Sequence, residues 1–408
     1  MAVHNVSLTI ENMWGYYTSY DKNFDAPPDN HDDDPSSKNN QNSGAYIFRP
    51  SVPDQKPTFI QQTDAIFYNT SVGLEVHAKF EVPWIKTITR VITGQPYLEV
   101  EYTVGPIPMD DGRGKEIISR IQTPIKNSGI LYTDSNGREF MKRQRNFRPT
   151  WDLEVFEPVA GNFYPVNAAL YIQDNAGVAI AVATDRSQGG ASLEDGSLEL
   201  MVQRRTLADD WRGVNEPMNE TDGGITAYPP YGNATRLGDG VVIKGKHYIR
   251  IGNKGGAGLA RSMMDQAFAD AMVFVGTAGH DETPEFFATH IVGSTESIPS
   301  NVMVITRAVL YDEETKTILL RLGHQYGIGE DDKLSGPVEV DLASLLPGYE
   351  IVSVSETTLS ANQDLQAWKK RRFDWTGSFH AIDDIERAPG MTITLQPMEI
   401  RTFTIKVI

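Results

Sequence analysis

The sequence predicts an all-β protein built from antiparallel sandwiches. Many short segments alternate apolar and polar residues with a period of two, turn residues separate them, and helical patterns are rare. The chain has 408 residues, which is too long for one ordinary core, so we expect two or three domains. Hydrophobic residues make up 40% and charged residues 22%, the composition of a folded globular protein.

The strands follow from local pattern. The segment 98–104, LEVEYTV, alternates strictly and is typical of a half-buried strand. The segment 166–184 predicts a hairpin, because two apolar runs flank the turn sequence DNAG at 174–177, where a glycine is available for positive φ. Further strands are expected at 241–251, 302–310, 317–322 and 400–408.

Helices and connections are fewer. One helix is predicted over 262–271, with Ser262 and Asp265 as a capping pair, and a second over 361–372. The polar segment 21–42 predicts a mobile acidic surface loop, since it has almost nothing to bury. The segment 293–301 predicts a linker with a boundary near Pro299. We therefore expect a large sandwich over 1–298 and a small one over 299–408.

Composition limits the function. A net charge of −17 argues against nucleic acid or an anionic membrane as partner, and no apolar run approaches the roughly 18–20 residues that cross a bilayer. The absence of cysteine excludes disulfides and thiolate chemistry and weakly favours the cytosol. Against that stand glycosylation sequons, which favour a secreted or lysosomal protein. The sequons begin at Asn5, Asn69, Asn219 and Asn233. The opening residues lack the features of a signal peptide, so either the protein is cytosolic or its true N-terminus is missing.

Several apparent motifs fail on detail. The sequence HDDD at 31–34 lies in the predicted mobile loop, where ligands would not be pre-positioned for a metal. His280 and His290 match no zinc spacing. The glycine-rich stretch before 262–271 imitates a dinucleotide-binding turn, but it places Arg261 where the third glycine belongs.

The segment 209–213, DDWRG, carries the most distinctive polar group. Arg212 has a rigid donor fork that suits carboxylates and vicinal sugar hydroxyls, so Asp209 or Asp210 could hold it for a hydroxyl-rich ligand. Adjacent residues on a strand point to opposite faces, so the two aspartates are a poor acid–nucleophile pair for a glycosidase. A solvated polar turn and a polyol-binding site both remain open on these grounds.

Longer blocks carry a resemblance. The stretches SGAYIFRP (43–50), VGPIPMDDGRGKEIISRIQTP (104–124), YTDSNGREFMKRQRNFRPTW, EPVAGNFYPVNAALYI, TDRSQGGASLEDGSLELMVQRRTLADDWRGVNEP, ETTLSANQ and LQPMEIRTF resemble the C-terminal half of lysosomal-type α-mannosidases, glycoside hydrolase family 38. They occur in the family's order, from about residue 43 to the C-terminus. The acidic loop and residues 223–240 match poorly.

The resemblance implies a fold and a division of labour. It implies a large sandwich related to galactose mutarotase, followed by a smaller C-terminal β-sandwich. The family cleaves α-linked mannose with retention, using a zinc ion and an aspartate nucleophile of an N-terminal α/β domain that has no counterpart here. This chain is then expected to bind no metal and to be inactive alone. Its expected partners are that catalytic domain or heavy chain and mannose-containing glycans, in a lysosome or vacuole or outside the cell.

The resemblance also suggests site residues. Tyr46 of SGAYIF matches a tyrosine that approaches the bound mannose, and Arg212 of DDWRG matches an arginine at the rim of the pocket, held by Asp209 or Asp210. Three hypotheses follow: the β part of an α-mannosidase, a stand-alone carbohydrate-binding sandwich, and a structural scaffold that touches no ligand.

Overall fold

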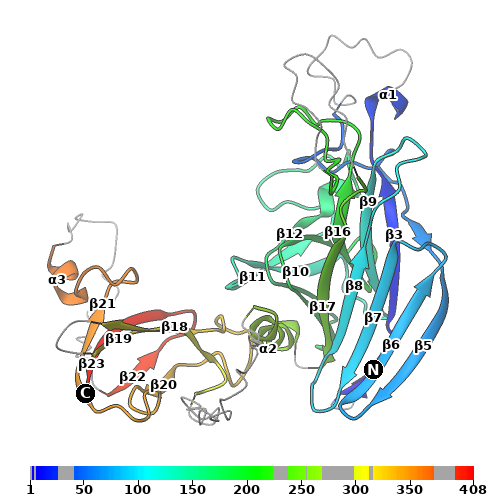
Figure 1. Cartoon of the computed structure of the whole chain (residues 1–408). Coiled ribbons are helices and arrows are strands. Elements are labelled where there is room, and N and C mark those ends of the chain that lie inside the picture. Colours follow the sequence, from blue (N-terminus) through cyan, green and yellow to red (C-terminus); the bar gives the residue numbers. More distant parts are fainter. Residues whose placement is uncertain are drawn as a thin grey trace, which may run out of the picture. The chain divides into compact units, whose positions relative to one another are not determined.

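The chain forms antiparallel β-sheets with few helices, which confirms the all-β prediction (Figure 1). The computed structural model describes residues 2–3, 6–25, 41–223, 238–253, 255–268, 298–311, 316–371 and 391–408. Two compact units divide the chain, Met1–Asp270 and Ala271–Ile408. The domain boundary expected near Pro299 stays a prediction. Among the described residues, no helix is long and apolar enough to cross a membrane.

The first unit contains two large sheets and a short hairpin. The nine-stranded sheet runs, in spatial order, β11 (Glu139–Gln144), β10 (Ile130–Ser135), β13 (Ala169–Gln173), β14 (Ala179–Thr184), β17 (Ile243–Gly252), β8 (Leu98–Val104), β7 (Ile85–Ile92), β6 (Gly73–Phe80) and β5 (Gln62–Thr70). The six-stranded sheet runs β12 (Tyr164–Val166), β15 (Gln188–Ala191), β16 (Ser197–Arg205), β9 (Lys115–Gln122), β3 (Glu11–Thr18) and β4 (Thr58–Ile60). The smaller elements are β1 (Ala2–Val3), β2 (Val6–Ser7), α1 (Lys22–Asp25), the 3-10 turn η1 (Ala160–Asn162) and α2 (Gly256–Phe268).

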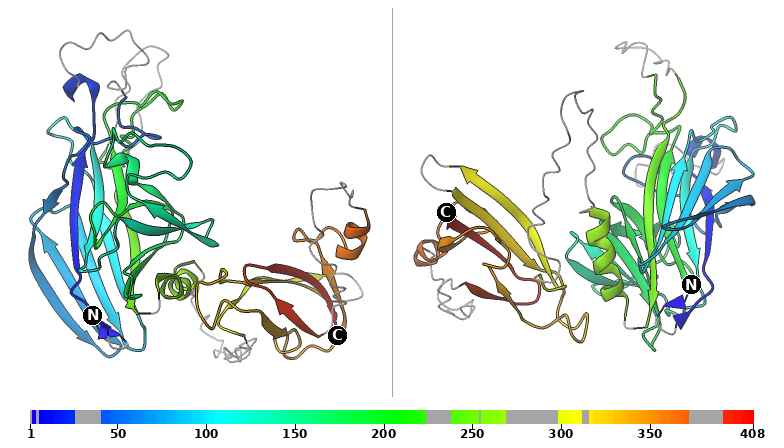
Figure 2. Two further views of the ribbon diagram at one scale, coloured as in Figure 1. Left: turned by 180° about the vertical axis from the view of Figure 1, so that it is seen from behind. Right: turned by 60° about the horizontal axis from the view of Figure 1, so that its bottom comes forward.

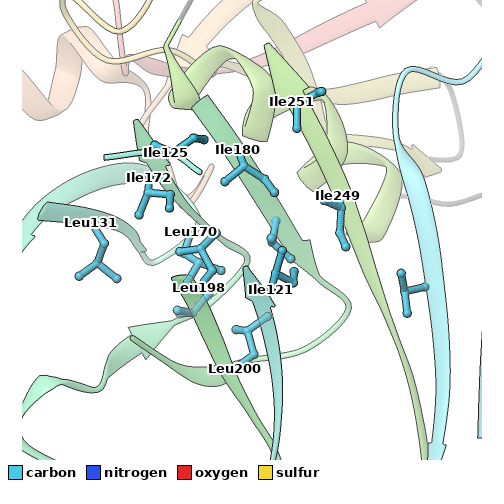
Figure 3. Close-up of a cluster of buried hydrophobic side chains, with 13 residues drawn as sticks. Ile121, Ile125, Leu131, Leu170, Ile172, Ile180, Leu198, Leu200, Ile249 and Ile251 are labelled. Carbon is cyan, nitrogen blue, oxygen red and sulfur yellow. The ribbon is translucent and has the colours of Figure 1, made fainter. Parts of the chain in front are cut away.

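The core of this unit lies between the two large sheets. Apolar side chains of β14 and β17 face those of β9 and β16 in one buried cluster, as Figure 3 shows. Strand β14 is buried on both faces, which explains why large and small apolar side chains alternate along it. Its larger residues, Ile180 and Val182, enter the sandwich, while Ala179, Ala181 and Ala183 leave room for α2 on the other face. The predicted hairpin is β13 and β14, with Gly177 at φ +82° in the turn.

Helix α2 covers the outer face of β13, β14 and β17 (Figure 2). It begins at Gly256, six residues before the predicted start at Ser262. The glycines that imitate a nucleotide-binding turn have a packing reason, since a Cβ on Gly256 would lie 2.0 Å from Cδ2 of Tyr171. The Gly256 N–H donates to Oε1 of Gln173 at 3.1 Å. Arg261 is buried over the ring of Phe140, so this segment serves helix–sheet packing.

The second unit has its own core. A four-stranded sheet runs β18 (Val302–Tyr311), β19 (Lys316–His324), β23 (Ile400–Val407) and β21 (Ile351–Thr357), and β20 (Val338–Asp341) pairs with β22 (Thr392–Leu395). Side chains of both sheets form one apolar cluster, in which Phe403, Ile405 and Val407 are buried as the alternation predicts. Helix α3 (Leu365–Lys370) is shorter than the predicted 361–372 and is capped by Asp364, whose carboxylate accepts from the Ala367 N–H at 2.8 Å.

Candidate functional site

The segment 41–50 meets the segment 206–213 at the end of the sandwich where β3 ends and α1 lies (Figure 1). Oδ2 of Asp210 accepts hydrogen bonds from the backbone N–H groups of Tyr46, at 2.6 Å, and Ile47, at 3.0 Å. Oδ1 of Asp210 accepts a third from the Arg212 N–H at 3.1 Å. The side chain of Asp210 is fully buried, so three oriented donors offset the loss of its hydration.

Close packing reinforces this contact. A Cβ on Gly44 would lie 2.7 Å from both Cβ and N of Asp210, so only a glycine lets the two segments approach this closely. On the other side of the segment, the guanidinium of Arg204 donates to the carbonyl of Gly44 at 2.6 Å and forms a buried ion pair with Glu116. Burial raises the pKa of Glu116, and the positive charge of Arg204 opposes that rise. The backbone before Tyr46 is therefore held from two strands of the six-stranded sheet.

The turn 209–212 is fixed by its own carboxylates. Oδ2 of Asp209 accepts from the Trp211 N–H at 2.8 Å, the same two-residue reach that Asp210 uses to Arg212. Trp211 takes a left-handed φ of +54°, and its ring lies 4.2 Å from Nζ of Lys22. Oδ1 of Asp209 is buried and has no hydrogen-bond partner in the described part of the chain. The structure shows an ordered polar turn tied to a second loop, and its role as a polyol-binding site stays a prediction.

The side chains expected to meet sugar point outward from this base. Tyr46 exposes 66% of its surface, and Arg212 is also exposed. The neighbouring Trp211, which was not among the expected site residues, exposes 52%. The expected carboxylate–guanidinium pair at Arg212 is wrong. Among the described residues, its guanidinium has no ion-pair partner. Both oxygens of Asp210 and Oδ2 of Asp209 instead accept from backbone N–H groups. The aspartates position the backbone, and the Arg212 side chain is exposed.

Sequence reasoning missed the supporting residues. Nδ2 of Asn42 donates to the Asp209 carbonyl at 3.0 Å, and Arg49 pairs with Glu157 at 2.7 Å while lying 4.1 Å from the Tyr20 ring. These residues stand in loops or on polar strand faces, where no periodic pattern marks them. The signal available in the sequence was the position of Arg49 and Glu157 inside the blocks SGAYIFRP and EPVAGNFYPVNAALYI.

The described residues contain no group of three or more His, Asp and Glu side chains that could hold a metal ion. They therefore do not offer the donor set that a catalytic zinc needs. The HDDD sequence, His280 and His290 lie outside the described residues.

Comparison with known proteins gives the family. The model "Glycosyl hydrolases family 38 C-terminal domain" matches residues 5–212, and "Glycosyl hydrolases family 38 C-terminal beta sandwich domain" matches residues 303–403. The chain belongs to glycosyl hydrolase family 38, as its sequence blocks predict, and the matched regions are C-terminal domains of that family.

Relatives agree with this assignment. The chain is 42% identical over 373 residues to the lysosomal alpha-mannosidase of Bos taurus, covering 89% of this chain and 35% of that protein. It is 40% identical over 376 residues to the lysosomal alpha-mannosidase of Homo sapiens (90% and 35%). It is 38% identical over 383 residues to an alpha-mannosidase of Arabidopsis thaliana (91% and 36%). The chain thus spans about a third of the length of the curated relatives it matches.

Proposed function

We propose that this chain is the C-terminal β part of a retaining, zinc-dependent α-mannosidase that hydrolyses α-mannosidic bonds of glycans. The observation that carries the proposal is the pair of family matches together with the Asp210 contact, which brings the Tyr46 and Arg212 segments to one surface. In this proposal the zinc ion, the nucleophile and the acid–base residue belong to an N-terminal α/β catalytic domain, which is the main partner of the chain.

The chain's own residues would form one wall of the sugar pocket. Arg212 presents up to five N–H donors in a fixed fork, suited to neighbouring hydroxyl groups of mannose. Tyr46 offers an aromatic face and a hydroxyl on a backbone that Asp210 and Arg204 hold in place. Such a wall would orient the sugar and exclude water, while bond cleavage takes place on groups of the partner domain.

The names of the relatives support a lysosomal location, while a vacuolar location or secretion rests on the family resemblance alone. Two alternative functions predict different experimental results. One is a carbohydrate-binding sandwich that acts without a catalytic partner, and the other is a scaffold that contacts no sugar. The exposed Tyr46 and Trp211 favour a ligand-binding role over the scaffold.

A chimera tests the proposal. The chain would replace the matching third of the bovine relative, and hydrolysis of an aryl α-mannoside would be measured for the parent chimera and for Arg212→Ala. We expect Arg212→Ala to lower kcat/KM about tenfold or more, since it removes charged donors to the sugar, and to leave Tm nearly unchanged because the side chain is exposed. Arg307→Ala, at an exposed arginine of β18, is the matched control and should change neither quantity. Unchanged kinetics for Arg212→Ala would favour the scaffold.

A further inference from the structure

A cavity of about 320 Å³ opens beside β3 and β4, under the β6–β7 turn and the segment 108–115 that follows β8. Its lining differs from that of the Tyr46–Arg212 surface and includes none of those residues. A volume of this size is at the lower end of small-molecule sites. The chemistry of its walls decides which ligand it would take.

Aromatic side chains form one part of the wall. Tyr16 comes from β3 and Trp84 from the β6–β7 turn, and both side chains are half-buried. Phe59 of β4 also borders the cavity, but its ring lies over Gly15 and 5.2 Å from the Arg120 guanidinium, on the face of β4 opposite to Tyr16. The two half-buried rings of Tyr16 and Trp84 suit the C–H face of a pyranose.

Carboxylates form another part, and they are not equivalent. Asp111 is occupied, because Nζ of Lys115 donates to Oδ1 at 2.7 Å and to Oδ2 at 2.8 Å. The donors of the Lys115 ammonium are also engaged, because it donates to the carbonyls of Pro108 and Arg113 as well. Asp110 also lines the cavity and is exposed, and no described residue donates a hydrogen bond or an ion pair to it. One carboxylate is therefore available to accept from a ligand.

Donors are available as well. The Tyr16 hydroxyl and the Trp84 indole N–H have no hydrogen-bond partner among the described residues. Glu81 uses one carboxylate oxygen on the Gln61 N–H at 3.0 Å and keeps the other. Three acidic side chains and one basic side chain line the cavity, so an anion is disfavoured. Aromatic surface, free acceptors and neutral donors together match a neutral, hydroxyl-rich ring.

We propose that this cavity is a second sugar site, which binds one hexose unit of a neutral glycan apart from the Tyr46–Arg212 surface. The choice of mannose as the sugar rests on the proposed function, whereas the existence of the site rests on the cavity alone.

The test is a fluorescence titration of the full chain with methyl α-mannoside and with α-1,2-mannobiose. We expect a saturable change in tryptophan emission with a millimolar Kd that disappears in Trp84→Phe. Asp110→Asn and Tyr16→Leu should raise Kd at least about fivefold, since they remove a charged acceptor and an aromatic face. Asp152→Asn, at an exposed aspartate without a described partner, is the matched control and should leave Kd within about twofold. Thermal melts of each variant establish that it is folded.

The outcomes separate this site from the proposed enzyme function. The titration does not depend on whether the chimera hydrolyses a mannoside, and the part of its signal that Trp84→Phe removes reports this cavity and not the Tyr46–Arg212 surface. No saturation up to about 100 mM sugar, or an equal Kd in Asp110→Asn, would overturn the proposal. Loss of binding in Arg212→Ala with retention in Asp110→Asn would also overturn it and place the sugar at the other surface. Binding of ethanolamine but of neither sugar would identify a cation site instead.

Discussion

Oδ2 of Asp210 accepts a 2.6 Å hydrogen bond from the backbone N–H of Tyr46, a residue 164 positions away in the sequence. This contact joins the two segments that the family resemblance marked separately. It joins a local turn and a loop into one surface. The carboxylate of Asp210 is buried beneath this surface, and the tyrosine, tryptophan and arginine side chains are exposed on it.

Removing that carboxylate should loosen the loop. We expect Asp210→Ala to lower the free energy of unfolding by about 2–4 kcal/mol, because three backbone donors lose a buried charged acceptor. Hydrogen exchange at the amides of Tyr46 and Ile47 should speed up, as measured by mass spectrometry. Asp152→Ala is the control at an exposed position. Exchange at these amides equal to that of the wild type would show that Asp210 does not hold the loop.

A methyl group at Gly44 should act on the same contact from the opposite side. In Gly44→Ala the new Cβ would lie 2.7 Å from Cβ and N of Asp210, so one segment must move. We expect a loss of about 1–3 kcal/mol in urea unfolding, together with faster exchange at Tyr46. Gly161→Ala is the matched control, because its Cβ would meet no atom within 4 Å. Equal stability of the two variants would contradict the described packing.

The stability of the first unit should depend on pH through His247. This histidine is fully buried, and burial lowers its pKa from 6.5 to about 4. Between these values the unfolded chain binds the proton and the folded chain does not, so stability falls as pH falls from about 6.5 to about 4. The full loss is about 3 kcal/mol at roughly 1.4 kcal/mol per pKa unit.

Comparing His247→Gln with the wild type isolates this contribution. Burial raises the pKa of Glu116 and Glu199, and those carboxylates act in the opposite direction, but they are present in both proteins. Urea unfolding at pH 7 and at pH 4.5 should show a smaller pH-dependent loss in His247→Gln. The same loss in both proteins would exclude His247 as its source.

Two described sequons should differ if the chain is made through the secretory pathway. Asn69 lies on the exposed end of β5, and no described residue bonds to its side chain. Asn219 is half-buried, and its Oδ1 accepts from Nε of Arg205 at 2.7 Å. We expect glycopeptide mass spectrometry to find Asn69 occupied to a greater extent than Asn219. The reverse order would mean that folding does not limit access at these positions.

The sequence predicted what depends on periodic burial. The alternation in 98–104 became β8, with Val100, Tyr102 and Val104 buried, because one strand face must enter the core. The start of α2 could not be predicted from local sequence. Gly256 is needed there because the ring of Tyr171, which is distant in sequence, leaves no room for a Cβ.

In the candidate site, too, the sequence indicated which residues take part but not their contacts. Tyr46, Asp209, Asp210 and Arg212 were named from sequence blocks, but which group holds which could not be known. The expected ion pair at Arg212 is absent from the described structure because the aspartates find nearer donors in the backbone, and such competition is set by the three-dimensional approach of two loops.

In the function proposed here, this chain supplies a sugar-facing wall, and another domain cleaves the bond. The hydrolysis rate of an aryl α-mannoside, in the presence of zinc, should be measured for the purified chain alone and for the chain joined to the unmatched portion of the bovine relative. We predict no turnover by the chain alone and turnover by the joined protein. Full activity of the chain alone would show that it carries its own catalytic groups.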